Sequence, residues 1–548
     1  MKASDLLVRC LEAEGVRVIF GLPGEENEDL LFSLRGSSVR FVSCRHEQGA
    51  AFMADIWGRL TGRAGVCLST LGPGATNLVT GIADAHLDKA PLVALTGQGG
   101  VERLHKESHQ AIDVVGMLRP LVKWNTSISR PGVIPEVVRK AFKLAEMEKP
   151  GATHLELPED VAKLETDAEP LVPRRVRRPS PDYKALETAV EVLRSARHPL
   201  ILAGNGAIRK RASSHLRRLV EYTGIPVVNT FMGKGAVSAR DPRSLLSVGM
   251  VARDHVQAAF DRADVVLAVG YDAAEYDPKI WNQARRARIV SLDFEPAEVD
   301  GHYQPEVELV ADVSGSLWAL DRRVRELGLR FGNWALPLRR RILDDLALYA
   351  PAEGAPLTVP GCLALLREVM GDEDVLLSDV GSHKVWIARN FPAYEPNTVL
   401  ISNGLASMGV SLPGGVAAKL ALPDRRVVCA MGDGGFLMNV QEIETATRAG
   451  VSFPILVFDD GGYGLIRWKQ RDHRGGSVGT DLANPDFAAL AESFGIRGYA
   501  PGTVAELRAV LREVVPAQQM CVVAVAVDPS CDEALTRRLA SEAGCPLF

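Results

Sequence analysis

The stretches AMGDGGF (430–436) and VFDDGGYG (457–464) place glycine and aspartate directly after runs of apolar residues. Runs such as RRVVCAM and FPILVF, short and rich in β-branched residues, are typical of buried parallel strands. Asp433 follows the first run and Asp460 follows the second. Ligands of parallel α/β sheets bind at the carboxyl ends of the strands. The two stretches therefore predict an α/β fold with a binding site at these strand ends.

The same pattern recurs along the whole chain. Three groups of five apolar runs, each followed by a helix-length stretch, lie within residues 16–160, 198–313 and 374–529. Strands that alternate with helices indicate parallel sheets covered by helices. The expected fold class is therefore α/β, with three successive domains that each contain a mostly parallel sheet flanked by helices.

Two proline-rich passages interrupt this pattern, AEPLVPRRVRRPSPD around residues 166–182 and YAPAEGAPLTVPG at 349–361. Prolines at such density are typical of linkers. A chain of 548 residues is also too long for one hydrophobic core. We therefore expect the domains to span residues 1–165, 183–345 and 358–535.

The composition is ordinary for a globular protein, with 47% apolar residues. The net charge of −5 provides no basic surface for nucleic acid or an anionic membrane, and no apolar run reaches the ~20 residues that cross a bilayer. Residues 1–16 alternate charged and apolar residues, as in an amphipathic helix and unlike a signal peptide. We expect a cytoplasmic protein that binds neither nucleic acid nor a membrane.

The eight cysteines are scattered and include no CxxC pair. Several lie inside apolar runs such as VVCAMG, where a reduced thiol that fills the core is the simplest interpretation and agrees with a reducing compartment. They are Cys10, Cys44, Cys67, Cys362, Cys429, Cys521, Cys531 and Cys545.

Asp433 and Asp460 have the chemistry of a metal site. Two carboxylates on adjacent strand ends can hold one hard cation such as Mg²⁺, whose other ligands are phosphate oxygens, a backbone carbonyl and water. The neighbouring glycines let backbone amides approach phosphate oxygens, and a helix N-terminus favours the negative charge. Either aspartate alone can instead cap a helix. Two of them at strand ends favour the metal site.

These motifs resemble those of the thiamine-diphosphate enzymes of the acetolactate synthase and 2-oxo acid decarboxylase superfamily. The resemblance covers essentially the whole chain and is most specific in residues 45–98, which begin RHEQGAAFMAD. It implies the thiamine-diphosphate-binding fold, with pyrimidine, central and diphosphate domains in that order. It also implies the cofactors thiamine diphosphate and Mg²⁺.

By this resemblance the metal ligands are Asp433, Asp460 and the backbone carbonyl of Gly462. The superfamily usually has an asparagine where this chain has Asp460, so the carboxylate adds negative charge at the metal. The residues implied in cofactor binding are Gly381, Ser382, His383, Met408, Gly432, Asp433, Gly434, Gly435, Asp460, Gly462, Tyr463 and Gly464.

Glu47 ends the apolar run VRFVSCRHE. In enzymes similar to this chain, that glutamate hydrogen-bonds the aminopyrimidine ring and promotes loss of the proton from the thiazolium carbon. A carboxyl group suits this task where poor solvation raises its proton affinity. The alternative is that Glu47 caps the helix that starts near Gly49. Its place inside the most specific stretch favours the catalytic role.

Two further residues are similar to active-site positions of the superfamily. Met408 matches the bulky apolar residue that bends the cofactor, and core packing is its alternative role. Gln110 matches a glutamine that reaches the active centre in acetolactate synthase-like members, and a surface or capping role is the alternative.

The resemblance favours a synthase over a simple decarboxylase. Pyruvate decarboxylase-like members have paired histidines where this chain reads Ser108-His109-Gln110, and glyoxylate carboligases lack the glutamate that is retained here. The expected reaction joins two 2-oxo acids, pyruvate first, into 2-acetolactate with loss of CO₂. The stretch AVGYDAAEYDPKIWN (268–282) is closest to the catabolic enzymes that work without FAD, so FAD is disfavoured, although LAGNGA and FMGKGA can line a nucleotide cleft.

Several questions stay open at this point. Decarboxylation of a larger, for example aromatic, 2-oxo acid is one alternative, and a regulatory protein that kept the fold without catalysis is another. Glu25, Glu26 and Asn27 either face the substrate or form a solvated helix start. Similar enzymes share each active site between two subunits, which implies a homodimer or homotetramer.

Overall fold

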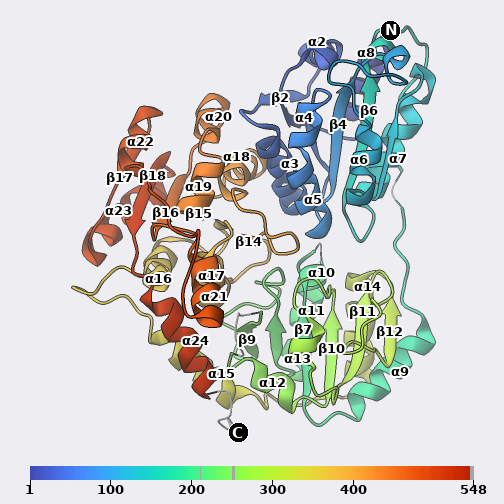
Figure 1. Ribbon diagram of the computed structural model, residues 1–548. Helices are drawn as coiled ribbons and strands as arrows, with labels where there is room; N and C mark the ends of the chain where they lie inside the picture. The colour runs from blue at the N-terminus through green and yellow to red at the C-terminus, as the bar shows by residue number, and fades with distance from the viewer. Residues whose placement is uncertain (175, 210, 250–253, 543–548) are drawn as a thin grey trace. The chain divides into compact units, whose positions relative to one another are not determined.

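The computed structural model describes residues 1–174, 176–209, 211–249 and 254–542. Three six-stranded sheets, one in each third of the chain, form its framework (Figure 1). Every strand pair in these sheets is parallel. The predicted fold class of three α/β domains is therefore confirmed.

The first sheet has the order β2-β1-β3-β4-β6-β5. Its two longest strands, β4 and β6, are buried along their whole length, as expected when helices cover both faces of a sheet. The strands are β1 (Val18–Gly21), β2 (Arg40–Ser43), β3 (Gly65–Ser69), β4 (Leu92–Gln98), β5 (Trp124–Ser127) and β6 (Ala152–Pro158).

The second sheet has the order β12-β11-β10-β7-β8-β9. The strands are β7 (Pro199–Ala203), β8 (Val227–Asn229), β9 (Ser244–Ser247), β10 (Val265–Val269), β11 (Arg288–Asp293) and β12 (Val307–Val310).

The third sheet has the order β14-β13-β15-β16-β18-β17. The strands are β13 (Val375–Ser378), β14 (Val399–Ile401), β15 (Val427–Gly432), β16 (Pro454–Asp459), β17 (Arg497–Tyr499) and β18 (Cys521–Ala526).

The fifteen apolar runs of the sequence account for five strands in each sheet, and one strand per sheet was missed. The missed strands are β5, β9 and β17, and each lies at the same end of its sheet order. They have only three or four residues, and β5 and β17 are incompletely buried. An edge strand with one partner needs less apolar sequence, so its pattern is weak.

Helices connect the strands, and the N-terminal one shows the expected amphipathic pattern. Helix α1 (Ala3–Ala13) buries Leu6, Leu7 and Leu11. The other helices of the first third are η1 (Glu25–Asn27), α2 (Glu28–Arg35), α3 (Glu47–Thr61), α4 (Pro73–Asn77), α5 (Val79–Leu87), η2 (Val101–Arg103), α6 (Val114–Leu118), η3 (Arg119–Leu121), η4 (Pro131–Val133), α7 (Ile134–Glu146) and α8 (Glu159–Lys163).

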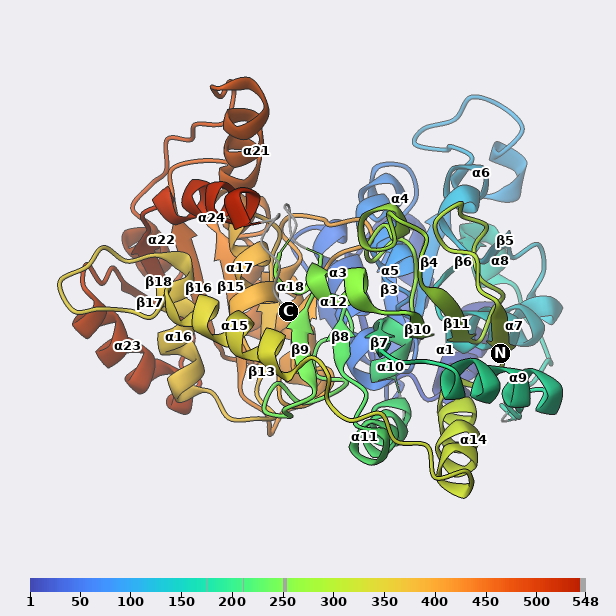
Figure 2. The same cartoon turned by 90° about the horizontal axis from the view of Figure 1, so that it is seen from below.

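The helices of the second third cover its sheet, and Figure 2 shows α9 beside α14. They are α9 (Tyr183–Arg194), α10 (Asn205–Ile208), α11 (Ala212–Thr223), α12 (Gln257–Arg262), α13 (Pro278–Trp281), α14 (Val313–Glu326) and α15 (Leu336–Ala347).

In the last third, α17, α21 and α24 pack next to one another (Figure 1). The helices are α16 (Val359–Val369), α17 (Ser382–Asn390), α18 (Ser411–Ala421), α19 (Asp433–Met438), α20 (Glu442–Ala449), α21 (Gly464–Arg474), α22 (Phe487–Ser493), α23 (Val504–Ala517) and α24 (Ser530–Glu542).

The first expected linker contains no helix or strand in the residues described, and the second contains none up to Thr358, because α16 begins at Val359. The first separates α8 from α9, and the second separates α15 from α16. The predicted domain bounds themselves remain predictions.

The chain divides into two compact units. Unit 1 contains residues 1–176, 404–424 and 436–453, and unit 2 contains the other segments. Helices α18 and α20 of the last third thus pack in unit 1. Helix α18 packs closely against α3 because both present small side chains, such as Ala50 and Ala417, that are fully buried.

Seven of the eight cysteines are described, and all seven are free thiols. Six are buried and Cys531 is partly exposed, which agrees with the predicted core-filling role. Burial raises the pKa of Cys67 to about 12, so this thiol stays protonated near neutral pH. Cys545 lies outside the described residues.

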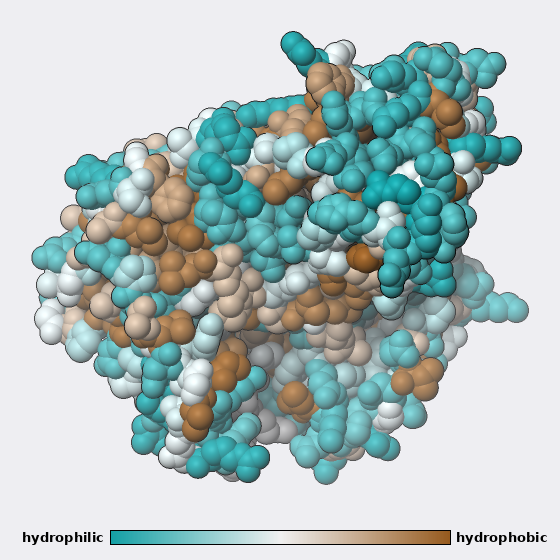
Figure 3. Space-filling model, turned by 45° about the horizontal axis from the view of Figure 1, so that its top comes forward, coloured by the Kyte–Doolittle hydropathy of each residue, from teal (hydrophilic) through white to brown (hydrophobic). Residues whose placement is uncertain are grey.

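In the described part of the chain, no helix is both long and apolar enough to cross a bilayer. Figure 3 shows one face, on which hydrophilic side chains alternate with smaller apolar patches.

Candidate active site

Three adjacent strands of unit 2 bring the predicted diphosphate segments together. Strands β13, β15 and β16 are neighbours and parallel, so their carboxyl ends lie at the same edge of the sheet. Helices α17, α19 and α21 begin just beyond these ends. Three helix N-termini at one edge supply unpaired backbone N–H groups and favourable partial charge for an anion.

Asp433 is the first residue of α19, and its carboxylate is 2% exposed. Its oxygens accept hydrogen bonds from the backbone N–H of Gly434 at 2.8 Å and of Gly462 at 2.9 Å. Burial raises the pKa of Asp433 despite these donors. The carboxylate therefore links the ends of β15 and β16.

Asp460 lies directly after β16 and is half-buried. Its Oδ1 atom has no hydrogen-bond partner in the described part of the chain. Burial, followed by the charge of Asp433, raises the pKa of Asp460 to about 7. A Cβ atom at Gly464 would overlap the Asp460 carboxylate, so only glycine lets the start of α21 approach this closely.

Asn484 was missed by the sequence analysis. Its side-chain amide donates to Asp433 at 2.7 Å and to Asp459 at 2.8 Å. It comes from a polar loop, TDLANPDF, that no apolar pattern or motif distinguishes. Such a bridge fixes the orientation of a carboxylate that faces a ligand or metal.

His383 and Ser382 begin α17, with Gly381 before them. The His383 ring lies next to Gly432 and 5.8 Å from the Phe458 ring, centre to centre. Burial lowers the pKa of His383 to about 3. The imidazole is therefore neutral near pH 7 and offers a hydrogen bond rather than a positive charge.

The remaining predicted residues of this edge lie in the same place. The Tyr463 ring packs on Gly434, where an added Cβ would lie 3.0 Å from it. Gly435 lies against the buried side chain of Asp379. The backbone carbonyl of Gly462 accepts from the N–H of Gly464 at 2.9 Å.

This edge fits a divalent cation held together with a diphosphate. Asp433 is buried, Asp460 is half-buried beside it, and the two carboxylates repel each other. The buried Oδ1 atom of Asp460 has no partner in the residues described, and a cation would remove each of these costs. No group of three or more His, Cys, Asp or Glu side chains suited to a metal occurs in the residues described. Proteins usually bind Mg²⁺ through one or two carboxylates, and phosphate oxygens and water fill the other coordination positions.

Glu47 lies in unit 1, as the first residue of α3. Its side chain is buried and accepts a hydrogen bond from Asn77 Nδ2 at 2.9 Å. The alternative capping role falls to His46, whose Nδ1 accepts from the N–H of Gln48 at 3.0 Å. The Glu47 carboxylate therefore does not cap this helix.

A buried glutamate of α20 holds the segment before Glu47 in place. Glu442 is fully buried and accepts from the backbone N–H groups of Arg45 and His46, each at 3.1 Å. A Cβ at Gly49 would lie 2.8 Å from its Oε1. Sequence reasoning missed Glu442, because nothing in its helix marks it apart from a surface residue.

The LGPG loop (71–74) of unit 1 lies close to both Glu47 and Gln110. An added Cβ at Gly74 would lie 3.3 Å from Glu47 Oε1, and one at Gly72 would lie 2.7 Å from the Gln110 carbonyl oxygen. Gln110 is exposed and adopts a left-handed backbone, with φ of 58°. A left-handed residue other than glycine is strained and often has a functional reason.

Met408 also belongs to unit 1, where it is half-buried just before α18. The structure thus groups Glu47, Gln110 and Met408 in unit 1. It groups all the predicted diphosphate and metal residues in unit 2.

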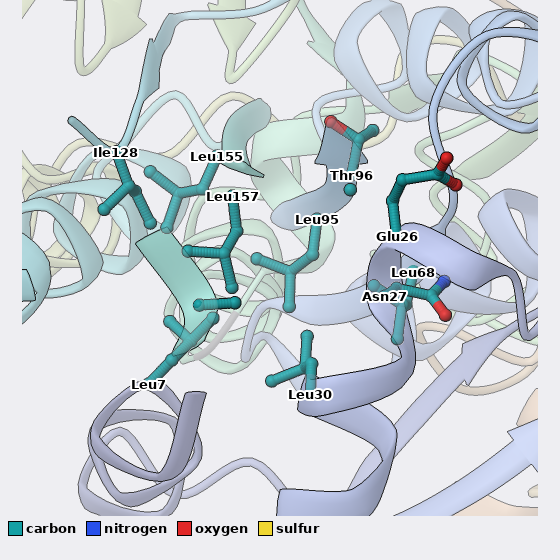
Figure 4. A pocket seen from close by; sticks show the side chains of 12 residues that line it. Leu7, Glu26, Asn27, Leu30, Leu68, Leu95, Thr96, Ile128, Leu155 and Leu157 are labelled. Carbon is teal, nitrogen blue, oxygen red and sulfur yellow. The ribbon is translucent and has the colours of Figure 1, made fainter. Parts of the chain in front are cut away.

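The sequence left open whether Glu25, Glu26 and Asn27, in the loop after β1, face the substrate or form a solvated helix start. Asn27 is buried and stabilises the turn. Its side chain accepts a hydrogen bond from the Gly24 N–H and donates one to the Leu22 carbonyl. Glu26 accepts from Thr70 Oγ1 at 2.9 Å, and Glu25 is exposed. Figure 4 shows Glu26 and Asn27 at the margin of a leucine-lined cavity of about 10 Å³, which has room for a single water molecule.

The strand ends of the central sheet hold a carboxylate of the protein itself. Glu275 is 9% exposed and accepts from Thr230 Oγ1 and from the backbone N–H groups of Asn205 and Asp272. Asn205 belongs to LAGNGA and Thr230 directly precedes FMGKGA. The two segments that suggested a nucleotide cleft therefore bind a carboxyl group of the protein itself.

Comparison with protein families identifies all three domains in the predicted order. Residues 1–117 match the N-terminal TPP binding domain of the thiamine pyrophosphate enzymes, residues 186–320 match the central domain, and residues 379–525 match the C-terminal TPP binding domain. The predicted cofactor, thiamine diphosphate, is thereby supported.

Relatives of the whole chain are similar over nearly their full length. The acetolactate synthase of Bacillus subtilis is 33% identical over 544 residues, which cover 96% of this chain and 94% of the relative. The catabolic acetolactate synthase of Raoultella terrigena is 33% identical, with 96% and 95% covered. A probable acetolactate synthase large subunit of Methanococcus aeolicus is 32% identical, with 97% and 92% covered. The chain therefore belongs to the acetolactate synthase family of thiamine pyrophosphate enzymes.

Proposed function

We propose that this enzyme joins two pyruvate molecules into 2-acetolactate and CO₂. One pyruvate loses its carboxylate as CO₂, and the remaining two-carbon unit bonds to the carbonyl carbon of the second pyruvate, whose oxygen takes up a proton. The near-full-length similarity to relatives named acetolactate synthases carries this proposal.

When bound, thiamine diphosphate supplies the carbon nucleophile that makes the decarboxylation possible. We propose that Asp433, Asp460 and the carbonyl of Gly462 hold Mg²⁺, with Asn484 orienting Asp433. The N-termini of α17, α19 and α21 would bind the diphosphate oxygens. This assignment rests on the mutual repulsion of the two carboxylates and the glycines beside them.

Glu47 is the proposed catalytic acid–base residue of unit 1. Its burial and its single neutral donor, Asn77, suit a group that exchanges a proton with the aminopyrimidine of the cofactor. Gln110 and Met408 are proposed to contact the substrate and the cofactor rings, respectively.

We propose that the enzyme works without FAD. The carboxyl group of Glu275 accepts a hydrogen bond from the backbone N–H of Asn205, in the loop where a nucleotide phosphate would bind. A bound phosphate and this carboxylate would repel each other. Purified enzyme is expected to show no visible flavin absorption, and a Glu275→Ala variant tests whether the cleft then accepts added FAD.

A homodimer or homotetramer is proposed, in which two subunits share each active site. Analytical ultracentrifugation with and without cofactor tests this assembly. A monomer that is fully active would rule it out.

The reaction is tested with purified enzyme, thiamine diphosphate and Mg²⁺. Pyruvate is expected to give a product that yields acetoin after acid treatment. A panel of aromatic 2-oxo acids, followed for aldehyde release, tests the alternative of simple decarboxylation. Aldehyde without hydroxyketone would overturn the proposed carboligation.

A further inference from the structure

Unit 2 contains a cavity that the proposed active site does not use. Its volume is about 250 Å³, close to the lower end for small-molecule sites. It is lined by β8, β9 and the segment between them, by α15, and by the end of α17 and the segment that follows it. None of its lining residues belongs to the predicted cofactor or metal site.

A lysine that has no charged partner among the described residues lies in the wall of this cavity. Lys234 is 5% exposed, and its Nζ donates to the Ala388 carbonyl at 2.8 Å and to Ser247 Oγ at 3.3 Å. Burial alone lowers its pKa to about 7, with no contribution from any described carboxylate. A buried ammonium bound only by neutral groups is costly unless an anion joins it.

The other cations of the lining are already neutralised. Arg389 is paired with Asp254 at 2.9 Å and with Asp345. Arg240 is paired with Asp372. Among the described residues, the cavity therefore offers one uncompensated positive charge, which suits a single carboxylate group rather than a phosphate ester with two charges.

A buried acceptor lines the same space. Asn229 is 4% exposed, and its Oδ1 has no hydrogen-bond partner in the residues described. A ligand with a hydroxyl or ammonium group would satisfy it. The rest of the wall includes apolar side chains, among them Leu343, Leu346 and Phe391.

The backbone around the cavity departs from regular geometry. Leu246 has φ of 64°, in the left-handed region that a leucine rarely adopts. The pairing of β8 with β9 shifts register between Val227 and Asn229. Strain and bulges of this kind cluster where a protein aims side chains at a ligand.

We propose that this cavity binds a small monocarboxylate that carries a hydroxyl or ammonium group and a short apolar body. Lys234 Nζ binds the carboxylate, Asn229 Oδ1 accepts from the hydroxyl or ammonium, and Leu343, Leu346 and Phe391 contact the apolar part. The site lies outside the proposed active site and would act as an effector site.

Calorimetry on the full-length enzyme, loaded with thiamine diphosphate and Mg²⁺, tests the proposal with four probes. 2-Hydroxybutanoate and 2-aminobutanoate carry the full set of groups, butanoate lacks the donor, and 2-hydroxybutanamide lacks the charge. We expect saturable binding of one of the first two, binding of butanoate weaker by about tenfold, and none of the amide. The tighter of the first two identifies the ligand as a hydroxy acid or an amino acid.

Variants separate this site from the active site, which also accepts small carboxylates. Lys234→Met and Leu343→Glu are expected to weaken binding by at least about tenfold. Leu348→Glu and Lys184→Met, at exposed positions outside the cavity lining, serve as matched controls and should bind as the wild type does. Leu343 is 42% exposed, so its variant keeps the test valid even if Lys234→Met does not fold. Equal affinity in all variants, or no binding of any probe, would overturn the proposal.

Discussion

The side-chain amide of Asn77 donates to the carboxylate of Glu47 at 2.9 Å, and this is the hydrogen bond that fixes the orientation of the buried acid. Asn77 ends α4, which follows the LGPG loop, and Glu47 begins α3. The acid is thus held between two helix ends, with Glu442 fixing the segment before it. A neutral donor orients Glu47 without neutralising its charge.

Glu47→Gln is expected to lower kcat by about 100-fold or more, because the amide cannot exchange the proton that the carboxyl group exchanges. Cofactor affinity, measured by calorimetry, should change much less than turnover. Glu136→Gln, at an exposed position of α7, is the matched control. Unchanged turnover in Glu47→Gln would exclude the proposed cofactor activation.

Asp433→Asn is expected to weaken Mg²⁺ binding by at least about tenfold, because it removes a charged oxygen ligand. The measurement is a Mg²⁺ titration of thiamine diphosphate binding. Asp486→Asn is the control, since Asp486 caps α22 and asparagine caps equally well. If both variants had the wild-type Mg²⁺ requirement, Asp433 would not be a ligand.

Asp460→Asn is expected to raise the melting temperature of the metal-free enzyme at pH 8. The wild type must then keep a half-buried carboxylate charged beside Asp433, with its buried Oδ1 atom unpartnered among the described residues. Saturating Mg²⁺ and thiamine diphosphate should reduce or reverse this gain, because the cation stabilises the charged form. Thermal denaturation with and without Mg²⁺ measures both states. A variant less stable than the wild type in the metal-free state would contradict this account.

The charge on Glu275 should make stability depend on pH. Burial, followed by the charge of Asp272, raises its pKa to about 7 in the folded protein, whereas a free glutamate titrates near ~4.3. The folded state therefore holds this proton more tightly than the unfolded state. The stabilisation is complete below about pH 4.3 and is lost as the pH rises through 7, with a total on the order of 3 kcal/mol.

The measurement for Glu275 is the melting temperature of the wild type minus that of Glu275→Gln, followed from pH 5 to pH 8. The difference should fall as the pH rises, because glutamine does not titrate. Comparison of the two proteins cancels the other titrating groups. A melting-temperature difference that does not change with pH would show that Glu275 has the same pKa in the folded and unfolded states.

The inner strands and three of the edge strands, β2, β12 and β14, were predicted from the sequence, and the other three edge strands, β5, β9 and β17, were not. Strand β16, flanked by β15 and β18, is apolar and buried up to its last residue, so its pattern is strong. Strand β5 has one neighbour, β6, and all four of its residues are only partly buried. Apolar patterning reports burial, and an edge strand is buried on fewer sides.

The sequence by itself determined the strand-end aspartates, the buried glutamate and the family. These signals are local, because a strand end, a glycine and a carboxylate follow one another directly in AMGDGGF and VFDDGGYG. Only the tertiary structure decided which distant side chains complete the site. Asn484 joins Asp433 across 51 positions of the chain, and Glu442 reaches Arg45 across 397. Such partners carry no local pattern, because their role depends on contacts that exist only after the chain has folded.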